Sequence, residues 1–280
     1  MKFDFFTFGG RYCWEDLFIY QNWRIQRHYL YKDYRLLDSF DIRRESGTFE
    51  KCHKTFLEFV KAYEMEKQKD QVVILLHGLN ESKDIFDSLK KKMAKENYLP
   101  MSVNYPSTKK NIDSNVRQLN VLMNNLADAT QVSFIAKGIG GIILRKLIAS
   151  NEEWKKRIKV KRVIQVSPPN KGSRFLTKLS EYAAFKWKLG PVISELSPKK
   201  IEKMPVFPKN IDLGIIHCDY PFKKAAAYLP KKIRGFLPSQ VEGDIDSPNK
   251  SIYISNTKRN VMDNEKIVNA CIRFLKDGLF

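Results

Sequence analysis

Three short segments of the chain combine residue types that could support nucleophilic chemistry. His77 and Gly78 follow a run of apolar residues, residues 137–141 read KGIGG, and residues 167–173 read SPPNKGS. Glycine at a tight turn lets backbone N–H groups approach a reacting oxygen closely. Hydrolysis by a serine needs, in addition, the serine nucleophile, a base within hydrogen-bond reach and a carboxylate that orients the base.

The spacing of apolar residues predicts the elements that position these segments. A continuous apolar run predicts a strand buried on both faces at 72–76. Further strands are expected at 101–105, 131–136, 162–166, 213–217 and 251–254. Helical spacing predicts helices at 48–66, 82–96, 112–127, 139–149 and 263–276. Such alternation is typical of a parallel sheet with right-handed crossovers.

We therefore expect a single α/β domain over residues 1–280. Residues 1–70 should supply N-terminal strands and a helix, with short strands or extended segments of 1–45 at the edge of the sheet. Residues 175–240 are rich in proline and contain one apolar run, which predicts a lid or loop region.

Residues 132–142, VSFIAKGIGGI, closely resemble the nucleophile elbow of the α/β-hydrolase superfamily, in particular of bacterial lipases and esterases. The segment SPPNKGS resembles a PPN[RK]GS segment of that group. Residues 8–16, 24–27 and 274–280 are also similar, so the resemblance covers nearly the whole chain. It implies an α/β-hydrolase fold, in which a mostly parallel, doubly wound sheet is flanked by helices and carries a small lid-like insertion.

The resemblance places Gly138 where these enzymes have the serine nucleophile. Ala136 replaces the first glycine of the motif, and Lys137 replaces the usual histidine. The loop after the first buried strand would supply one oxyanion-hole N–H, near Leu79. The residues expected to form the oxyanion hole and pocket are His77, Gly78, Leu79, Lys137, Gly138 and Ile139.

The resemblance also locates the base and the acid, and neither is intact. Counting back from the C-terminal helix places Lys258 at the base position, or Asn256 after a two-residue shift, and neither is a neutral imidazole. The nearest acid is Glu242, with Asp244 as the alternative. The four histidines, at 28, 53, 77 and 217, lie elsewhere, and we expect packed or surface side chains there.

Three functions follow as hypotheses. The first is a catalytically impaired pseudoenzyme that binds an acyl or lipid-like small ligand, or a partner. The second is an active carboxylic-ester hydrolase with a relocated nucleophile. Its candidate residues are Ser133, Ser167, Ser173 and Cys218, with His77 or His217 as the base. The third is a basic interaction module for anionic lipid or nucleic acid.

Composition limits the partners. The net charge of +19 is consistent with an anionic membrane surface as partner, or with lysines spread over solvated faces by coding bias. The densest basic clusters, at 90–92, 155–162 and 231–234, come with no nucleic-acid-binding motif, so nucleic acid is not an expected partner.

Four separated cysteines predict reduced thiols without a metal site, and no cofactor is expected. Without a signal peptide or a long apolar run, we expect a cytoplasmic protein that could lie on a membrane.

Overall fold

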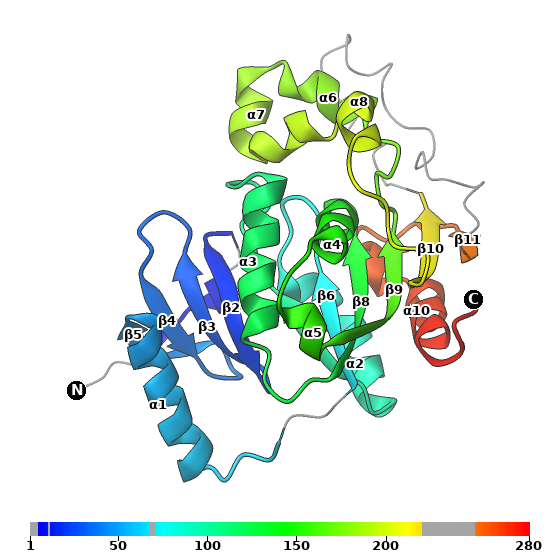
Figure 1. Ribbon diagram of the computed structural model, residues 1–280. Helices are drawn as coiled ribbons and strands as arrows, with labels where there is room; N and C mark the ends of the chain where they lie inside the picture. Colours follow the sequence, from blue (N-terminus) through cyan, green and yellow to red (C-terminus); the bar gives the residue numbers. More distant parts are fainter. Residues whose placement is uncertain (1–4, 11, 68–70, 220–249) are drawn as a thin grey trace.

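The computed structural model describes residues 5–10, 12–67, 71–219 and 250–280, and it contains two sheets (Figure 1). The larger sheet has the strand order β11-β10-β9-β8-β6-β7, and all its neighbouring strands are parallel. Its strands are β6 (Gln71–Leu76), β7 (Leu99–Val103), β8 (Gln131–Lys137), β9 (Lys159–Val166), β10 (Asp212–Cys218) and β11 (Lys250–Ile254). The predicted α/β architecture is confirmed.

Helices cover both faces of this sheet, as the unbroken apolar run of β6 requires. Val72, Ile74 and Leu76 pack in one core with α3 (Ile112–Asn124) and α4 (Ile139–Ala149). Val73 and Leu75 face the opposite core, with α2 (Asp87–Lys95) and α10 (Glu265–Asp277). Short α5 (Trp154–Arg157) precedes β9, and 3₁₀ turns at Lys83–Phe86 (η2) and Val261–Asp263 (η5) precede α2 and α10. The predicted helix at 82–96 is thus divided into η2 and α2.

The N-terminal residues form a sheet of their own, so their expected place at the edge of the main sheet is wrong. This antiparallel sheet has the order β1-β5-β4-β3-β2. The two-residue turn at Gln21 and Asn22, both with positive φ, folds β2 back on β3 as a hairpin. Its strands are β1 (Phe5–Phe6), β2 (Trp14–Tyr20), β3 (Trp23–His28), β4 (Tyr34–Leu37) and β5 (Ile42–Gly47).

Helix α1 (Phe49–Ala62) packs on this smaller sheet. Thr48 caps the helix by accepting the N–H of Lys51, and Cys52 and Phe56 face the apolar side of the sheet. A short 3₁₀ turn, η1 (Phe8–Gly10), follows β1. The two sheets meet where the N–H of Asp16 donates to the carbonyl of Asn104, just beyond β7.

The region predicted as a lid or loop contains short helices that the proline content did not reveal. These are α6 (Arg174–Ser180), α7 (Ala183–Leu189), η3 (Pro191–Glu195) and α8 (Pro198–Glu202). Pro191 and Pro198 lie in the first turn of their helices, where the missing N–H has no intrahelical partner to lose. Figure 1 shows α6, α7 and α8 together at the end of the molecule toward which β8 and β9 point. Residues 220–240 of the predicted region lie outside the described residues.

None of the helices in the described ranges is long and apolar enough to cross a membrane. The four cysteines are unpaired with one another; Cys52, Cys218 and Cys271 are buried, and Cys13 is partly exposed.

Candidate functional site

A sharp turn connects β8 to α4 at the carboxyl end of the parallel sheet. Gly138 alone forms this turn, with φ of 54° and ψ of −124°, a conformation that glycine adopts without strain. Its N–H donates to the carbonyl of Val166 at 2.9 Å. A Cβ on Gly140 would lie 2.7 Å from the carbonyl oxygen of His77, so α4 packs directly on the end of β6. The predicted strand–turn–helix geometry at residues 131–149 is therefore present.

The loop after β6 lies beside this turn because β6 and β8 are paired, with Leu76 opposite Ala136. Neither the N–H of Leu79 nor that of Ile139 has an acceptor within the part of the chain that the structure describes. Ile139 is the first residue of α4, where the helix dipole favours negative charge. Both residues were expected among the oxyanion-hole and pocket residues, and the N–H groups of both lack an acceptor within the described ranges.

His77 is completely buried under the same loop. Its ring stacks on Tyr105, with 4.1 Å between the ring centroids. Its Nδ1 lies 2.8 Å from the carbonyl oxygen of Gly78, and its Nε2 accepts the N–H of Tyr105 at 3.5 Å. Burial lowers the pKa of His77 to about 4, so the ring is neutral at neutral pH. Both ring nitrogens therefore have structural partners.

Lys137 and Glu81 form an ion pair over the glycine loop. The Lys137 side chain is 8% exposed and that of Glu81 is 23% exposed. The second Glu81 oxygen accepts the N–H of Gly78 at 2.8 Å. A Cβ on Gly78 would lie 2.6 Å from that oxygen and 3.6 Å from Lys137 Nζ. Lys137 was predicted as a pocket residue, whereas Glu81 was missed because nothing in its sequence surroundings marks it as a partner.

The serines proposed as relocated nucleophiles lie in a strand, at a helix cap and at a strand end. Ser133 lies within β8 and is buried, and Ser173 caps α6 by accepting the N–H of Leu176 at 3.2 Å. Ser167 Oγ lies 2.6 Å from Cys218 Sγ, at the ends of β9 and β10. Burial raises the pKa of the Cys218 thiol, although the hydrogen bond between it and Ser167 and the charge of Lys137 oppose the rise. His217 is also buried, on β10.

The loop after β11 contains both residues considered for the base. Lys258 is exposed, whereas Asn256 is 4% exposed. Asn256 binds the backbone N–H and carbonyl of Lys258 through its side chain, at 3.2 and 2.9 Å. Its own N–H donates to Asp219 at 3.4 Å.

Asp219 follows β10 directly, and its carboxylate also accepts the hydroxyl of Tyr253 at 2.6 Å. It is a strand-end carboxylate beside the loop after β11, and sequence reasoning missed it. Glu242 and Asp244, the acids that were predicted, lie outside the described residues. Across the described ranges, no group of three or more His, Cys, Asp or Glu side chains is placed to hold a metal ion.

The chain has the α/β-hydrolase fold. The solved structure of the lipase BlEst2 from Bacillus licheniformis matches it with a TM-score of 0.56 and 14% identity, covering 76% of this chain and 94% of the lipase. An epoxide hydrolase from Bacillus megaterium matches with a TM-score of 0.47, 12% identity and coverage of 76% and 96%. No protein-family model and no curated protein sequence matches the chain. At these identities the similarity shows the fold alone.

Proposed function

We propose that this α/β-hydrolase-fold protein does not hydrolyse esters through a serine, and that the turn at Gly138 binds the carbonyl or carboxylate of an acyl or lipid-like ligand. The observation that carries the proposal is the residue at the β8–α4 turn. A serine nucleophile in this fold occupies the sharp turn between such a strand and such a helix, and Gly138 has no side chain there. The geometry of the turn is kept while the attacking atom is missing.

The surrounding groups support the same conclusion. A base must reach the nucleophile, but the His77 ring is stacked on Tyr105 and bonded through both nitrogens. Lys258 is exposed. Burial keeps the Cys218 thiol protonated, which weakens it as a nucleophile. Without a nucleophile and a base, only the small rate enhancement of binding and an oxyanion hole would remain.

The site keeps the groups that bind an oxygen anion. The N–H groups of Leu79 and Ile139 lack acceptors in the described part of the chain, and the N-terminus of α4 favours negative charge. These donors suit the carboxylate of a fatty acid as well as the carbonyl of an ester. Ligand binding therefore requires no residue that the turn has lost.

Catalysis is tested with a fluorophosphonate probe and p-nitrophenyl butyrate. We expect the wild type to show neither labelling nor turnover above the uncatalysed rate. Gly138→Ser combined with Lys258→His, and Gly138→Ser combined with Asn256→His, test whether a nucleophile and a base suffice to restore activity. Labelling of the wild type at Ser167, or turnover that Cys218→Ala abolishes, would instead establish the relocated nucleophile.

Ligand binding is tested separately with 11-(dansylamino)undecanoic acid, by fluorescence titration. Ile139→Pro removes one donor N–H at a helix position where proline is tolerated, and Ile139→Ala is the matched control that keeps the N–H. We expect Ile139→Pro to weaken binding by about tenfold relative to Ile139→Ala, the loss of roughly one hydrogen bond to a charged group. Equal affinities, with both variants folded by circular dichroism, would exclude the turn as the binding site.

A further inference from the structure

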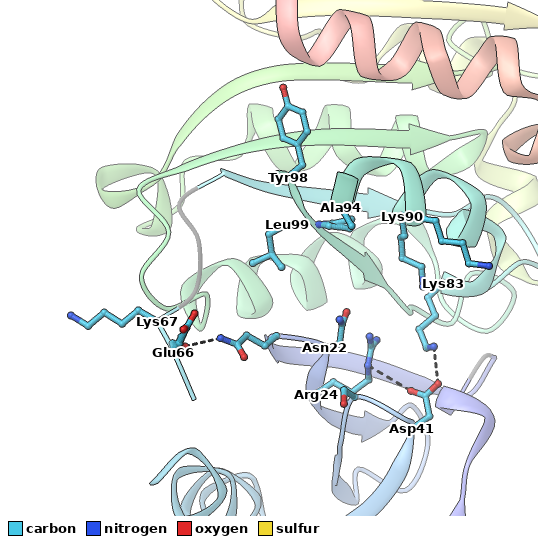
Figure 2. Close-up of a pocket in the computed structure, with 14 residues that line it drawn as sticks. Asn22, Arg24, Asp41, Glu66, Lys67, Lys83, Lys90, Ala94, Tyr98 and Leu99 are labelled. Carbon is cyan, nitrogen blue, oxygen red and sulfur yellow. Dashed lines mark hydrogen bonds and ion pairs between the residues drawn. The ribbon is translucent and has the colours of Figure 1, made fainter. Parts of the chain in front are cut away.

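A cavity of about 540 Å³ lies between the small N-terminal sheet and strand β7 at the edge of the parallel sheet. It is lined by the β2–β3 turn, the end of the segment after α1, helix α2 and the first residues of β7. Figure 2 shows Glu66 and Lys67 at one end of the cavity and Asp41 and Lys83 at the other. None of its lining residues belongs to the turn at Gly138 or to the loop after β6 that carries Leu79. It is therefore a concave site separate from the turn at Gly138, of a size that suits a small organic molecule.

Cationic side chains outnumber carboxylates in the lining. The cations are Arg24, Lys67, Lys83, Lys90 and Lys91, and the carboxylates are Asp41 and Glu66. Ala94, Leu99 and Pro100 add an apolar wall. A ligand with one anionic end and an apolar body would match both kinds of surface.

The floor of the cavity contains a buried donor without an acceptor. Arg24 is 3% exposed, and its Nη1 donates to Asp16 at 2.7 Å. Its Nε has no hydrogen-bond partner in the described ranges, and the nearest carboxylate oxygen, on Asp41, is 3.9 Å away. Buried guanidinium N–H groups are normally satisfied, because an unmade hydrogen bond in the interior is costly. The Nε itself lies below the surface of the cavity, so Arg24 contributes positive charge to the floor and no hydrogen bond to a ligand.

The charge around the cavity is unevenly neutralised. Lys83 is paired with Asp41 at 2.8 Å and with Asp84 at 3.1 Å, and Lys90 is paired with Asp87 at 2.7 Å. Lys67 and Lys91 are exposed and have no ion pair with any described residue. The inner end is therefore close to neutral. The positive charge available to a ligand is on these two lysines, and the carboxylate of Glu66, beside Lys67, offsets part of it.

We propose that this cavity binds a small organic anion, a phosphate or carboxylate ester or acid with an apolar body. The apolar body would pack on Ala94, Leu99 and Pro100. Lys67 and Lys91 would attract and hold the anionic group. This site is separate from the turn at Gly138, so its occupancy does not depend on the function proposed for that turn.

The probe is 1-naphthyl phosphate, titrated by calorimetry into the full chain, with 1-naphthol as its neutral match and inorganic phosphate as the anion without an apolar body. We expect saturable binding of one naphthyl phosphate, and at least tenfold weaker binding of the other two compounds. Absence of naphthyl phosphate binding at millimolar concentration would overturn the proposal. So would equal binding of 1-naphthol, because the cations would then contribute nothing.

Two double variants of equal charge change localise the binding. Lys67→Glu with Lys91→Glu removes the two unpaired lysines of the cavity, whereas Lys54→Glu with Lys95→Glu changes two exposed lysines outside it. We expect the first pair to weaken naphthyl phosphate binding by at least about tenfold and the second by less than about threefold. Equal weakening by both would show attraction by net charge alone and would contradict a built site. Because all four side chains are exposed, neither variant should unfold the protein.

Discussion

At the scale of single residues, the site is described best by its ion pair. Lys137 occupies the position next to Gly138, and its charge is almost fully buried. A buried lysine needs a partner, and Glu81 provides one from the loop after β6. The same carboxylate accepts the N–H of Gly78, so it fixes this loop against the turn at Gly138. The pair holds the shape of the site without supplying a nucleophile.

His77 is the residue whose burial makes a measurable prediction about pH. Its ordinary pKa of 6.5 falls to about 4 in the folded protein, because burial disfavours the charged ring. Between these two values the unfolded chain binds a proton that the folded chain does not. The free energy of unfolding therefore decreases as the pH falls from 6.5 to 4, by about 3 kcal/mol for this group. Above pH 6.5 the contribution is constant.

The variant His77→Phe isolates this effect. Phenylalanine keeps a ring against Tyr105 but cannot be protonated, so the other titrating groups contribute equally to both proteins. Urea unfolding at several pH values should show the wild type losing about 3 kcal/mol more than the variant between pH 6.5 and pH 4. Parallel pH dependences would mean that the ring is protonated in the folded protein.

At the scale of elements, the site depends on how closely α4 approaches β6. A Cβ on Gly140 would meet two backbone oxygens, those of His77 and Leu76, at 2.7 and 2.8 Å. A Cβ on Gly141 would instead meet side-chain atoms, those of Gln165 at 2.8 Å and of Pro168 at 3.1 Å. We therefore expect Gly140→Ala to lower the free energy of unfolding by about 2–3 kcal/mol, and Gly141→Ala by at least 1 kcal/mol less. Thermal or urea unfolding of the two variants, which differ by one position, measures this difference. Equal losses would mean that α4 shifts away from β6 at little cost.

Much of this element arrangement could be predicted from the chain alone. Apolar runs such as 72–76 identify strands buried on both faces, and the glycines at 138–141 identify the turn between β8 and α4. The N-terminal sheet was misplaced, because residues 1–45 show alternation but nothing in alternation says which sheet a strand joins. The helices at 174–202 are too short for a helical period to show, and prolines there mark helix starts rather than loops.

The candidate site was predictable only where it depends on backbone. The loop at Gly78 and the turn at Gly138 follow from glycine and strand spacing. The sequence did not predict which side chains would contact one another. Glu81 meets Lys137 from 56 residues away, and Asp219 meets Asn256 from 37 residues away. Such pairs depend on the order of strands in the sheet, which spacing along one chain does not encode.

At the scale of the whole molecule, the attachment of the N-terminal sheet depends on Asp16. This carboxylate is completely buried and accepts hydrogen bonds from Arg24, Gln26 and the N–H of Asn104, all at 2.7 Å. Arg24 and Gln26 belong to β3, whereas Asn104 lies beyond β7 of the parallel sheet. Burial raises the pKa of Asp16, and the charge of Arg24 opposes that rise. One side chain therefore joins both sheets and also holds Arg24 at the floor of the cavity.

We predict that Asp16→Asn destabilises the small sheet and its contact with the parallel sheet more than it destabilises the centre of the parallel sheet. The substitution leaves the buried Arg24 without its nearest countercharge, which should cost about 3 kcal/mol in the free energy of unfolding. Hydrogen exchange should become faster at the amides of β2 and β3 and at Asn104, with little change in β8 and β9. Asp38→Asn is the matched control, since Asp38 is also buried but pairs with the part-exposed Arg44 within the small sheet. The control should cost about 1 kcal/mol and leave the exchange of Asn104 unchanged. If both variants accelerate hydrogen exchange at Asn104 equally, the contact between the sheets depends on their general stability and not on Asp16.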